Sequence, residues 1–379
     1  MGIPIVTMNI EKYILNFIPA YHKKADSSLF YGIAGENLLL YDIYKITNER
    51  RILNMIETNS ETILAKMADL HSTTFAYGYA GVLYSLLYLS NKQIISVNTT
   101  GFEIFNRFFE NQIYTCETQG NYDLQNGLLG IALYYLELQK ADKSSFAFLD
   151  MTLNILISMF KQVDEKIYVP YKLEKHQYFH KNLDFANLGH LHGMTSIIMF
   201  FLICIREGIN DSRLKRCIRT FLNMFIGMDF SSTQQWPLSF CIDKNNLILD
   251  KQNSKLFFCN GDFGLANCYF EAQKSGIYQC QEYLQKIISK LRYRIENEQT
   301  IHNACFCHGQ AGIYYFANKF KLASDSDKIQ SILDGMQSNI LNSVERRCEF
   351  GILNGFLGLA TSLLSKQNET SIERVLLLN

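Results

Sequence analysis

The sequence predicts an all-α protein built as an α/α toroid (barrel) with seven inner and seven outer helices. Three observations predict it. A glycine motif recurs seven times along the 379 residues, each copy is followed by a strongly apolar run, and only four prolines interrupt the chain. Repetition at this spacing is typical of proteins whose supersecondary units bury their apolar faces against one another.

The motif is Gly-x-x-Gly or a near match, and its first glycines are separated by 46, 49, 66, 68, 48 and 46 residues. Each interval has room for two helices and their turns. A glycine at this place lets the chain turn sharply and lets neighbouring backbones approach closely. The first glycines of the seven copies are Gly32, Gly78, Gly127, Gly193, Gly261, Gly309 and Gly355.

The run after each motif is apolar nearly all round, as in residues 82–89 and 131–136, which is typical of a buried helix. The intervening segments show a one-sided apolar stripe instead. In residues 283–295, for example, Lys290 and Arg294 are predicted mostly outside the stripe, on the wet side. Each repeat is therefore predicted to pair a buried inner helix with a half-exposed outer helix.

Inner helices that all run the same way would gather their N-termini at one end of the toroid. The residues beside the motif glycines are then expected to face a common central pocket.

The two longest intervals predict insertions beside the fourth repeat, at residues 163–188 and 229–256. Both contain β-like or irregular stretches, such as 167–171 and 236–242, and a hairpin or lid is expected there. No Pro/Ser-rich linker, low-complexity tract or charge block divides the chain. Residues 1–379 are therefore predicted to form a single domain.

The composition limits the kinds of partner that the protein is expected to bind. A formal net charge of +0 gives no electrostatic reason to expect binding to nucleic acid or to an anionic membrane. Ten cysteines without regular spacing indicate reduced thiols and a cytoplasmic location. No signal peptide is visible at the N-terminus, and the longest uncharged apolar run, residues 197–205, is too short to span a bilayer.

Cys259, Cys307 and His308 are the candidate metal ligands. Cys259 stands in Phe-Phe-Cys-Asn-Gly, and 48 residues later the pair Cys307-His308 stands in Phe-Cys-His-Gly. Two thiols and an imidazole can occupy three corners around zinc and leave the fourth for water or substrate, as in catalytic zinc sites. The spacing alone fits ordinary buried cysteines equally well. The shared glycine-turn context favours zinc, with Cys305 as a competing ligand.

At these residues the chain resembles the lanthionine synthetase C family, the LanC-like cyclases that close thioether rings in lantibiotic precursor peptides. The resemblance covers nearly the whole chain. It rests on the seven glycine motifs, the Cys-His-Gly at 307–309, the His-Gly at 192–193, and Asp123 four residues before Gly127. It implies a toroid holding one zinc on Cys259, Cys307 and His308. It also implies a dehydrated precursor peptide as substrate, with a dehydratase and a transporter as candidate partners.

The implied reaction adds a peptide cysteine thiol to dehydroalanine or dehydrobutyrine. A free thiol has a pKa of about 8.5, so only a few per cent is thiolate at neutral pH, and zinc would hold the bound sulfur deprotonated. The enolate that forms needs a proton on its α-carbon. His192 is the candidate acid, Asp123 would orient it, and Lys255 would stabilise the enolate oxygen.

Plainer interpretations of these three residues stay open. Asp123 could be a turn or N-cap residue, His192 a satisfied core histidine, and Lys255 a solvated loop lysine. The other nearby histidines, His176, His180 and His190, are expected at the surface or in the layer that supports the site.

The chain departs from the family pattern around Cys259. Phe258 and Asn260 stand where tryptophan and tyrosine are usual, Lys255 stands where arginine is common, and the fourth motif ends in Ser196. Two alternative functions remain open. One is a LanC-like protein that binds a thiol such as glutathione without cyclising anything. The other is an α/α barrel like the zinc-dependent prenyltransferase β-subunit, which needs a partner subunit and an aspartate ligand that the sequence does not place.

Overall fold

The computed structural model describes residues 9–23, 25–171, 184–226, 236–243, 246–249, 254–298, 303–324, 326–346 and 348–379. The chain groups into two compact units, each assembled from segments that are distant in sequence. The first unit contains Met1–Ser72, Ala76–Val97 and Thr300–Val375, and the second contains Thr73–Phe75, Asn98–Gln299 and Leu376–Asn379. A single domain over residues 1–379 stays a prediction.

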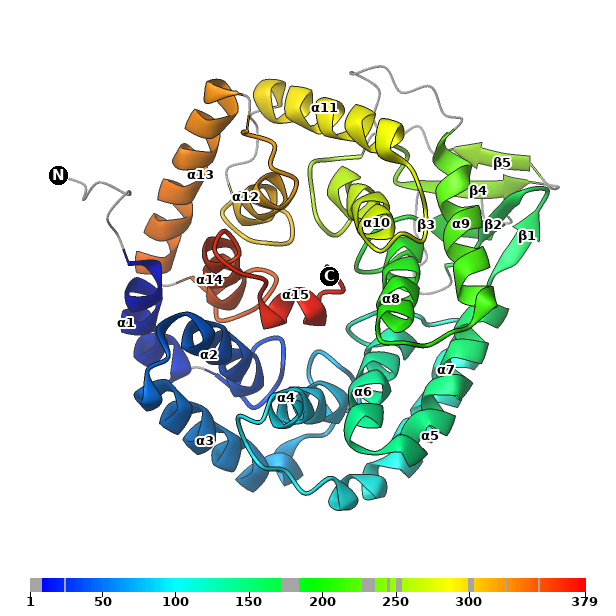
Figure 1. Ribbon diagram of the computed structural model, residues 1–379. Helices are drawn as coiled ribbons and strands as arrows, with labels where there is room; N and C mark the ends of the chain where they lie inside the picture. Colours follow the sequence, from blue (N-terminus) through cyan, green and yellow to red (C-terminus); the bar gives the residue numbers. More distant parts are fainter. Residues whose placement is uncertain are drawn as a thin grey trace. The chain divides into compact units, whose positions relative to one another are not determined.

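The first unit is helical (Figure 1). In it α2 packs against α3, α4 and α14, while α12 packs against α13 and α14. Its helices are α1 (Ile10–His22), α2 (Ile33–Thr47), α3 (Arg50–Ala65), α4 (Tyr79–Asn91), α12 (Gln310–Lys319), α13 (Asp327–Glu345), α14 (Phe356–Leu364) and α15 (Ser371–Val375).

The second unit adds strands to the same helical plan. In it α6 packs against α5, α7 and α8, and α10 packs against α8 and α11. Its helices are α5 (Glu103–Gln119), α6 (Leu128–Ala141), α7 (Phe146–Ser158), α8 (Met194–Arg206), α9 (Ser212–Ile226), α10 (Asp262–Lys274) and α11 (Gln281–Asn297).

Antiparallel strands occupy the predicted insertions beside the fourth repeat. One ladder pairs β1 (Lys161–Val163) with β2 (Lys166–Tyr168). The other has the order β3 (Asp184–Asn187), β4 (Ser239–Asp243) and β5 (Asn246–Leu249). The predicted β-like character of the insertions is thus confirmed, although parts of both insertions lie outside the described residues.

Inner and outer helices differ in burial as predicted. Each of the seven first glycines is the N-cap of an inner helix: α2, α4, α6, α8, α10, α12 and α14. In α6 every residue from Leu128 to Leu138 is buried. In α9, by contrast, the buried residues recur at helical spacing on one side, including Leu214, Ile218 and Phe221. The prediction that each repeat pairs a buried helix with an amphipathic helix is therefore confirmed.

Backbone hydrogen bonds join the motif turns of the first unit in a row. The Phe30 N–H donates to the Ala76 carbonyl oxygen (3.0 Å), and the Ile352 N–H donates to the Phe30 carbonyl oxygen (2.9 Å). The Cys307 N–H donates to the Leu353 carbonyl oxygen (2.9 Å). The turns before α4, α2, α14 and α12 thus stand side by side in this order.

The second unit repeats this arrangement. The Leu124 N–H donates to the Leu191 carbonyl oxygen (3.5 Å), and the His190 N–H donates to the Cys259 carbonyl oxygen (2.6 Å). In both units the residue directly before each first glycine is exposed or half-exposed, while its neighbours in the turn are mostly buried. These residues are Tyr31, Tyr77, Asn126, His192, Asn260, His308 and Asn354.

The second glycine of a motif provides room for the preceding repeat. A Cβ atom placed on Gly130 would lie 2.2 Å from the Cβ of Phe75, and one placed on Gly264 would lie 2.8 Å from the Cβ of His190. Both glycines lie inside helices, so they are required by close approach and not by an unusual backbone conformation. In the fourth motif Ser196 takes this place, and its hydroxyl donates to the Gly193 carbonyl oxygen (2.6 Å).

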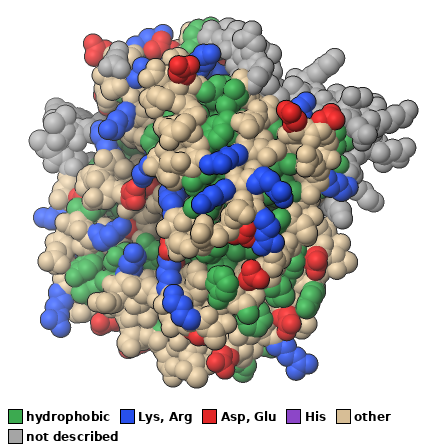
Figure 2. Space-filling view, turned by 45° about the vertical axis from the view of Figure 1, so that its right-hand side comes forward, with side chains coloured by type: hydrophobic (Ala, Val, Ile, Leu, Met, Phe, Trp, Pro, Cys, Tyr) green, Lys and Arg blue, Asp and Glu red, His purple; other side chains and the backbone are tan. Residues whose placement is uncertain are grey.

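The surface charges and the state of the cysteines agree with what the composition predicts. On the face shown in Figure 2, side chains of both charge signs are scattered among polar and apolar ones. None of the ten cysteines, all of which are described, is joined in a disulfide bond. Among the described residues, no helix combines the length and apolarity that crossing a bilayer requires.

We predict that Gly130→Ala lowers the free energy of unfolding by about 1–3 kcal/mol, because the added methyl group overpacks the contact with Phe75. The measurement is urea unfolding. Gly335→Ala in α13 is the matched control, since no atom lies within 4 Å of a Cβ placed there. It should be neutral or slightly stabilising, because alanine favours a helix interior. Equal stability of the two variants would contradict the close-approach explanation.

Candidate metal centre

The structure brings the three predicted ligands together. The ligand atoms of Cys259, Cys307 and His308 all lie within 4.8 Å of one another, and no other such group of His, Cys, Asp or Glu occurs among the described residues. Both cysteines are buried, whereas His308 is exposed. Two sulfurs and one imidazole nitrogen form a donor set that suits zinc and leaves one position open.

Cys307 and His308 are fixed by the turn before α12. The Cys307 sulfur lies 3.8 Å from Nε2 of His308. The His308 N–H donates to the sulfur of Cys305 (3.3 Å), and the Cys305 N–H donates to Oδ1 of Asn303 (2.9 Å). Cys305, the competing candidate, is not part of the ligand group and instead supports the backbone of His308.

Cys259 lies in a closed loop before α10. Lys255 and Gly261 form an isolated β-bridge, and the Asp262 N–H donates to the Lys255 carbonyl oxygen (3.1 Å). The carbonyl oxygen of Cys259 accepts the hydrogen bond from the His190 N–H. The loop is therefore tied at its base and beside the cysteine.

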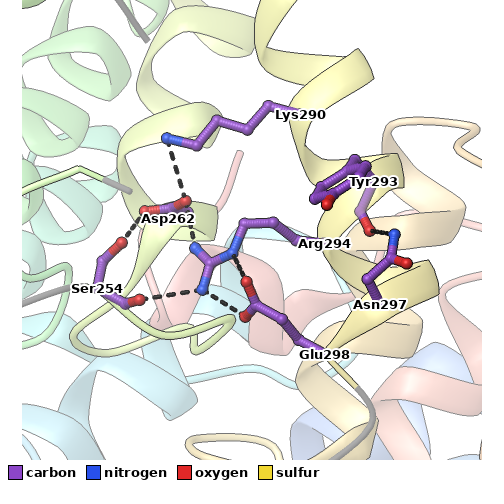
Figure 3. A network of polar contacts seen from close by, with 7 residues as sticks. All are labelled: Ser254, Asp262, Lys290, Tyr293, Arg294, Asn297 and Glu298. Atoms are coloured by element: carbon purple, nitrogen blue, oxygen red, sulfur yellow. Dashed lines mark hydrogen bonds and ion pairs between the residues drawn. The ribbon is translucent and has the colours of Figure 1, made fainter. Parts of the chain in front are cut away.

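A buried network of charges fastens the base of this loop to α11 (Figure 3). Asp262 accepts hydrogen bonds from the Ser254 hydroxyl and from Nη1 of Arg294, and its Oδ2 lies 3.6 Å from Nζ of Lys290. Arg294 also donates to the Ser254 carbonyl oxygen (3.0 Å) and to the Glu298 carboxylate (2.7 Å). The guanidinium thus connects both ends of the loop with the helix that backs it.

Burial makes these contacts mutually dependent. Asp262, Arg294 and Lys290 are 0%, 1% and 4% exposed. A buried charge is costly unless it is paired, so each cation requires the aspartate and the aspartate requires them. Burial lowers the pKa of Lys290, although the nearby Asp262 carboxylate opposes this shift. The Lys290 ammonium also lies 4.5 Å from the centre of the Trp236 ring, a cation–π distance.

This network corrects the prediction for α11. Lys290 and Arg294 were expected on the wet side of an outer helix, but both are buried. A helical periodicity pattern assigns every charged residue to the exposed side of the helix. It holds no information about a partner that lies 28 or 32 residues away in the sequence. One signal was available: α10 alone among the inner helices begins with a charged residue, Asp262, where the others begin with Ile33, Tyr79, Leu128, Met194, Gln310 and Phe356.

Asp123 and His192 form a pair in the second unit. Oδ1 of Asp123 accepts the N–H groups of Gln125 (2.7 Å) and Asn126 (2.8 Å), while Oδ2 contacts Nδ1 of His192. A carboxylate can only accept, so Nδ1 carries the hydrogen and Nε2 is the second nitrogen of the ring. The Asp123 side chain is buried and the His192 side chain is 36% exposed. The aspartate therefore orients a half-exposed imidazole.

The remaining candidates are placed differently. Lys255 is exposed, and its ammonium lies 5.6 Å from the centre of the Phe257 ring, so its role at the enolate oxygen stays a prediction. His176 and His180 lie outside the described residues.

His190 supports the site and is wholly buried. Besides its backbone bond to Cys259, its ring packs 4.8 Å from that of Phe258, and its Nε2 contacts the Leu376 carbonyl oxygen (2.8 Å). The sequence contains the signal for this burial. Two residues before the exposed residue, the other motif turns all hold a buried apolar side chain: Leu29, Phe75, Leu124, Phe258, Phe306 and Ile352.

The family and the fold of the chain are supported by comparison with known proteins. The model of the family described as lanthionine synthetase C-like protein matches residues 23–377. Comparison with curated proteins finds no similar sequence. Among solved structures, nisin cyclase is similar over 98% of this chain and 97% of its own, with 20% identity and a TM-score of 0.71. This likeness confirms the predicted α/α toroid fold class.

A second solved structure, an α-1,6-mannanase of Salegentibacter sp. HEL1_6, is similar over 97% of each chain, with 11% identity and a TM-score of 0.44.

We predict that Arg294→Leu lowers the free energy of unfolding by about 3–5 kcal/mol, because it leaves the buried Asp262 carboxylate poorly compensated. Adding Asp262→Asn should recover part of this loss. Both effects are measured by urea unfolding. Arg213→Leu removes an exposed ion pair with Asp211 and should leave stability unchanged. If Arg294→Leu were as stable as Arg213→Leu, the network would not hold the loop.

Proposed function

Because the chain belongs to the lanthionine synthetase C-like family, we propose that it is a zinc-dependent lanthionine synthetase. It adds peptide cysteine thiols to dehydroalanine or dehydrobutyrine and so forms thioether rings in a dehydrated precursor peptide. The observation that carries the proposal is the grouping of Cys259, Cys307 and His308 within 4.8 Å. The likeness to a structure named nisin cyclase supports it.

The ligand group fits zinc by its chemistry. Cys259 and Cys307 would supply two sulfurs and His308 a ring nitrogen, and zinc bound there would lower the pKa of a substrate thiol that joins it. The residues before the two cysteines, Phe258 and Phe306, are buried and apolar. Cys259 and Cys307 are themselves 2% and 3% exposed, and electrostatic interactions are stronger where water is scarce.

The reaction is a net addition of S–H across a carbon–carbon double bond. The thiol loses its proton, its sulfur attacks the β-carbon, and the π electrons move towards the carbonyl oxygen to give an enolate. A proton then reaches the α-carbon, so no oxidant or reductant is needed. We assign this proton to Nε2 of His192, because Nδ1 is already held by Asp123, whose carboxylate stabilises the charged imidazolium.

Lys255 remains the proposed partner of the enolate oxygen. It stands on the loop that carries Cys259, and its compact ammonium on a flexible stem can reorient when substrate arrives. A dehydratase and a transporter are the proposed partners in precursor processing, and the cytoplasm is the proposed location.

The pairing of Asp123 with His192 favours a cyclase over a protein that only binds thiols such as glutathione, since thiol binding needs no proton donor. The prenyltransferase alternative would require an aspartate ligand. The group found among the described residues contains none.

We predict that Cys307→Ala strips the protein of zinc and of cyclase activity while preserving its helicity, because the helical core is packed independently of the ligands. Elemental analysis measures the metal, and circular dichroism measures the fold. Cys305→Ala is the matched control and should retain zinc, since Cys305 lies outside the ligand group. Full zinc content in Cys307→Ala would refute the ligand assignment.

We predict that His192→Asn binds zinc normally but cyclises at least a hundredfold more slowly, since one proton-transfer group typically contributes about a hundredfold to ten-thousandfold in rate. The assay is single-turnover cyclisation of a synthetic peptide that carries one dehydroalanine and one cysteine. His71→Asn, at an exposed histidine outside both the ligand group and the Asp123–His192 pair, should match the parent. A rate for His192→Asn within a few-fold of the parent would mean that another group supplies the proton.

A further inference from the structure

Two tyrosines occupy the same register in their turns as His308. In the first unit Tyr31 precedes Gly32 and Tyr77 precedes Gly78, just as His308 precedes Gly309. The hydrogen bonds between residues 30 and 76, 30 and 352, and 353 and 307 set these turns in one row. The tyrosines therefore stand at positions equivalent to that of a metal-ligand candidate, on the exposed edge of the row.

The two rings form a stacked pair. Their centroids are 5.1 Å apart, and their planes are 8° from parallel. The edge of the Tyr31 ring rests against Gly351, where an added Cβ would lie 3.1 Å from Cδ1 of the tyrosine. Burial, assisted by the Tyr77 hydroxyl and by nearby Glu349 and Cys307, raises the pKa of Tyr31 above its ordinary value. A tyrosine hydroxyl has an ordinary pKa of about 10, so the Tyr31 hydroxyl is protonated at neutral pH and can donate a hydrogen bond.

The exposure of Tyr77 is exceptional for its position. Tyr77 is 46% exposed, and it is the one exposed large hydrophobic side chain of the motif turns among the described residues. The others lie on outer helices: Leu64, Ile104, Phe108, Tyr114, Phe146, Ile226 and Tyr293. An aromatic ring that stacks on one side and is partly exposed, in the same row of turns as a candidate metal ligand, is suited to a flat ligand group.

We propose that the Tyr31–Tyr77 pair is a subsite for the flat α,β-unsaturated amide of the dehydroamino acid in the substrate peptide. The inference rests on the proposed function and adds the place where the electrophile is held. Conjugation keeps a dehydroalanine or dehydrobutyrine residue planar, so it can lie on the Tyr77 ring, whereas a saturated residue has a tetrahedral α-carbon that prevents this. The Tyr31 hydroxyl can donate to the amide carbonyl oxygen.

The test compares two fluorescently labelled peptides that differ at one residue, dehydroalanine or alanine, and that contain serine in place of cysteine so that no reaction occurs. The dissociation constants are measured by fluorescence anisotropy. The parent protein should bind the dehydroalanine peptide about two- to tenfold more tightly, as expected for one aromatic stacking contact. Tyr77→Leu should lose this preference, and Tyr77→Phe should keep most of it because the ring remains.

Tyr114→Leu is the matched control, since Tyr114 is 51% exposed but lies on α5, outside the motif turns. It should preserve the preference. The subsite is refuted if the parent shows no preference or if Tyr77→Leu retains it with an unchanged thermal melt. Weaker binding of both peptides to Tyr77→Leu with the ratio preserved would also refute it, because the tyrosine would then contact another part of the peptide.

Cyclisation of the cysteine-containing peptide by the parent is measured separately and tests the proposed function by itself. If the parent cyclises and the preference is absent, only the subsite fails. If the preference depends on Tyr77 and the parent does not cyclise, the subsite stands and the cyclase proposal fails.

Discussion

The motif turn leaves no room for a side chain at its glycine, and the site depends on this constraint. A Cβ on Gly309 would lie 2.4–2.6 Å from the backbone of Asn303 and Cys305, and one on Gly261 would lie 2.1 Å from the Lys255 carbonyl oxygen. The backbone therefore folds tightly over the glycine. The cysteine before it is turned into the protein and the residue adjoining it is left exposed. The same turn that starts a buried helix thus presents a candidate metal ligand.

Much of this could be predicted from the sequence because the relevant interactions are local. The glycine spacing gave the inner helices, and their N-caps are the predicted glycines. The pairing of Asp123 with His192 is not local, since the two residues are 69 positions apart, and it was expected from the resemblance to the family and from the chemistry of the implied reaction. The burial of Lys290 and Arg294 could not be predicted in the same way, because it depends on a carboxylate about 30 residues away, and helical periodicity contains no term for a distant partner.

The supports of the candidate ligands differ in kind. Cys307 and His308 are held by backbone and thiol contacts within a row of turns, whereas the loop of Cys259 is fastened by buried charges. A buried ion pair adds little net stability, since desolvation offsets its attraction, but it strongly penalises any arrangement that separates the partners. Such a network is suited to fixing one loop geometry. Phe258, which stands where the family usually has tryptophan, also helps to fix this loop, because its ring packs against the buried His190.

We propose that Cys259, Cys307 and His308 together hold a zinc ion that a substrate thiol can join. Zinc K-edge X-ray absorption of the zinc-loaded protein, before and after addition of a cysteine peptide that lacks a dehydro residue, tests it most directly. We expect a zinc with two sulfur neighbours that gains a third when the peptide is added. A zinc without sulfur neighbours, or one whose two-sulfur environment the peptide leaves unchanged, would contradict the account.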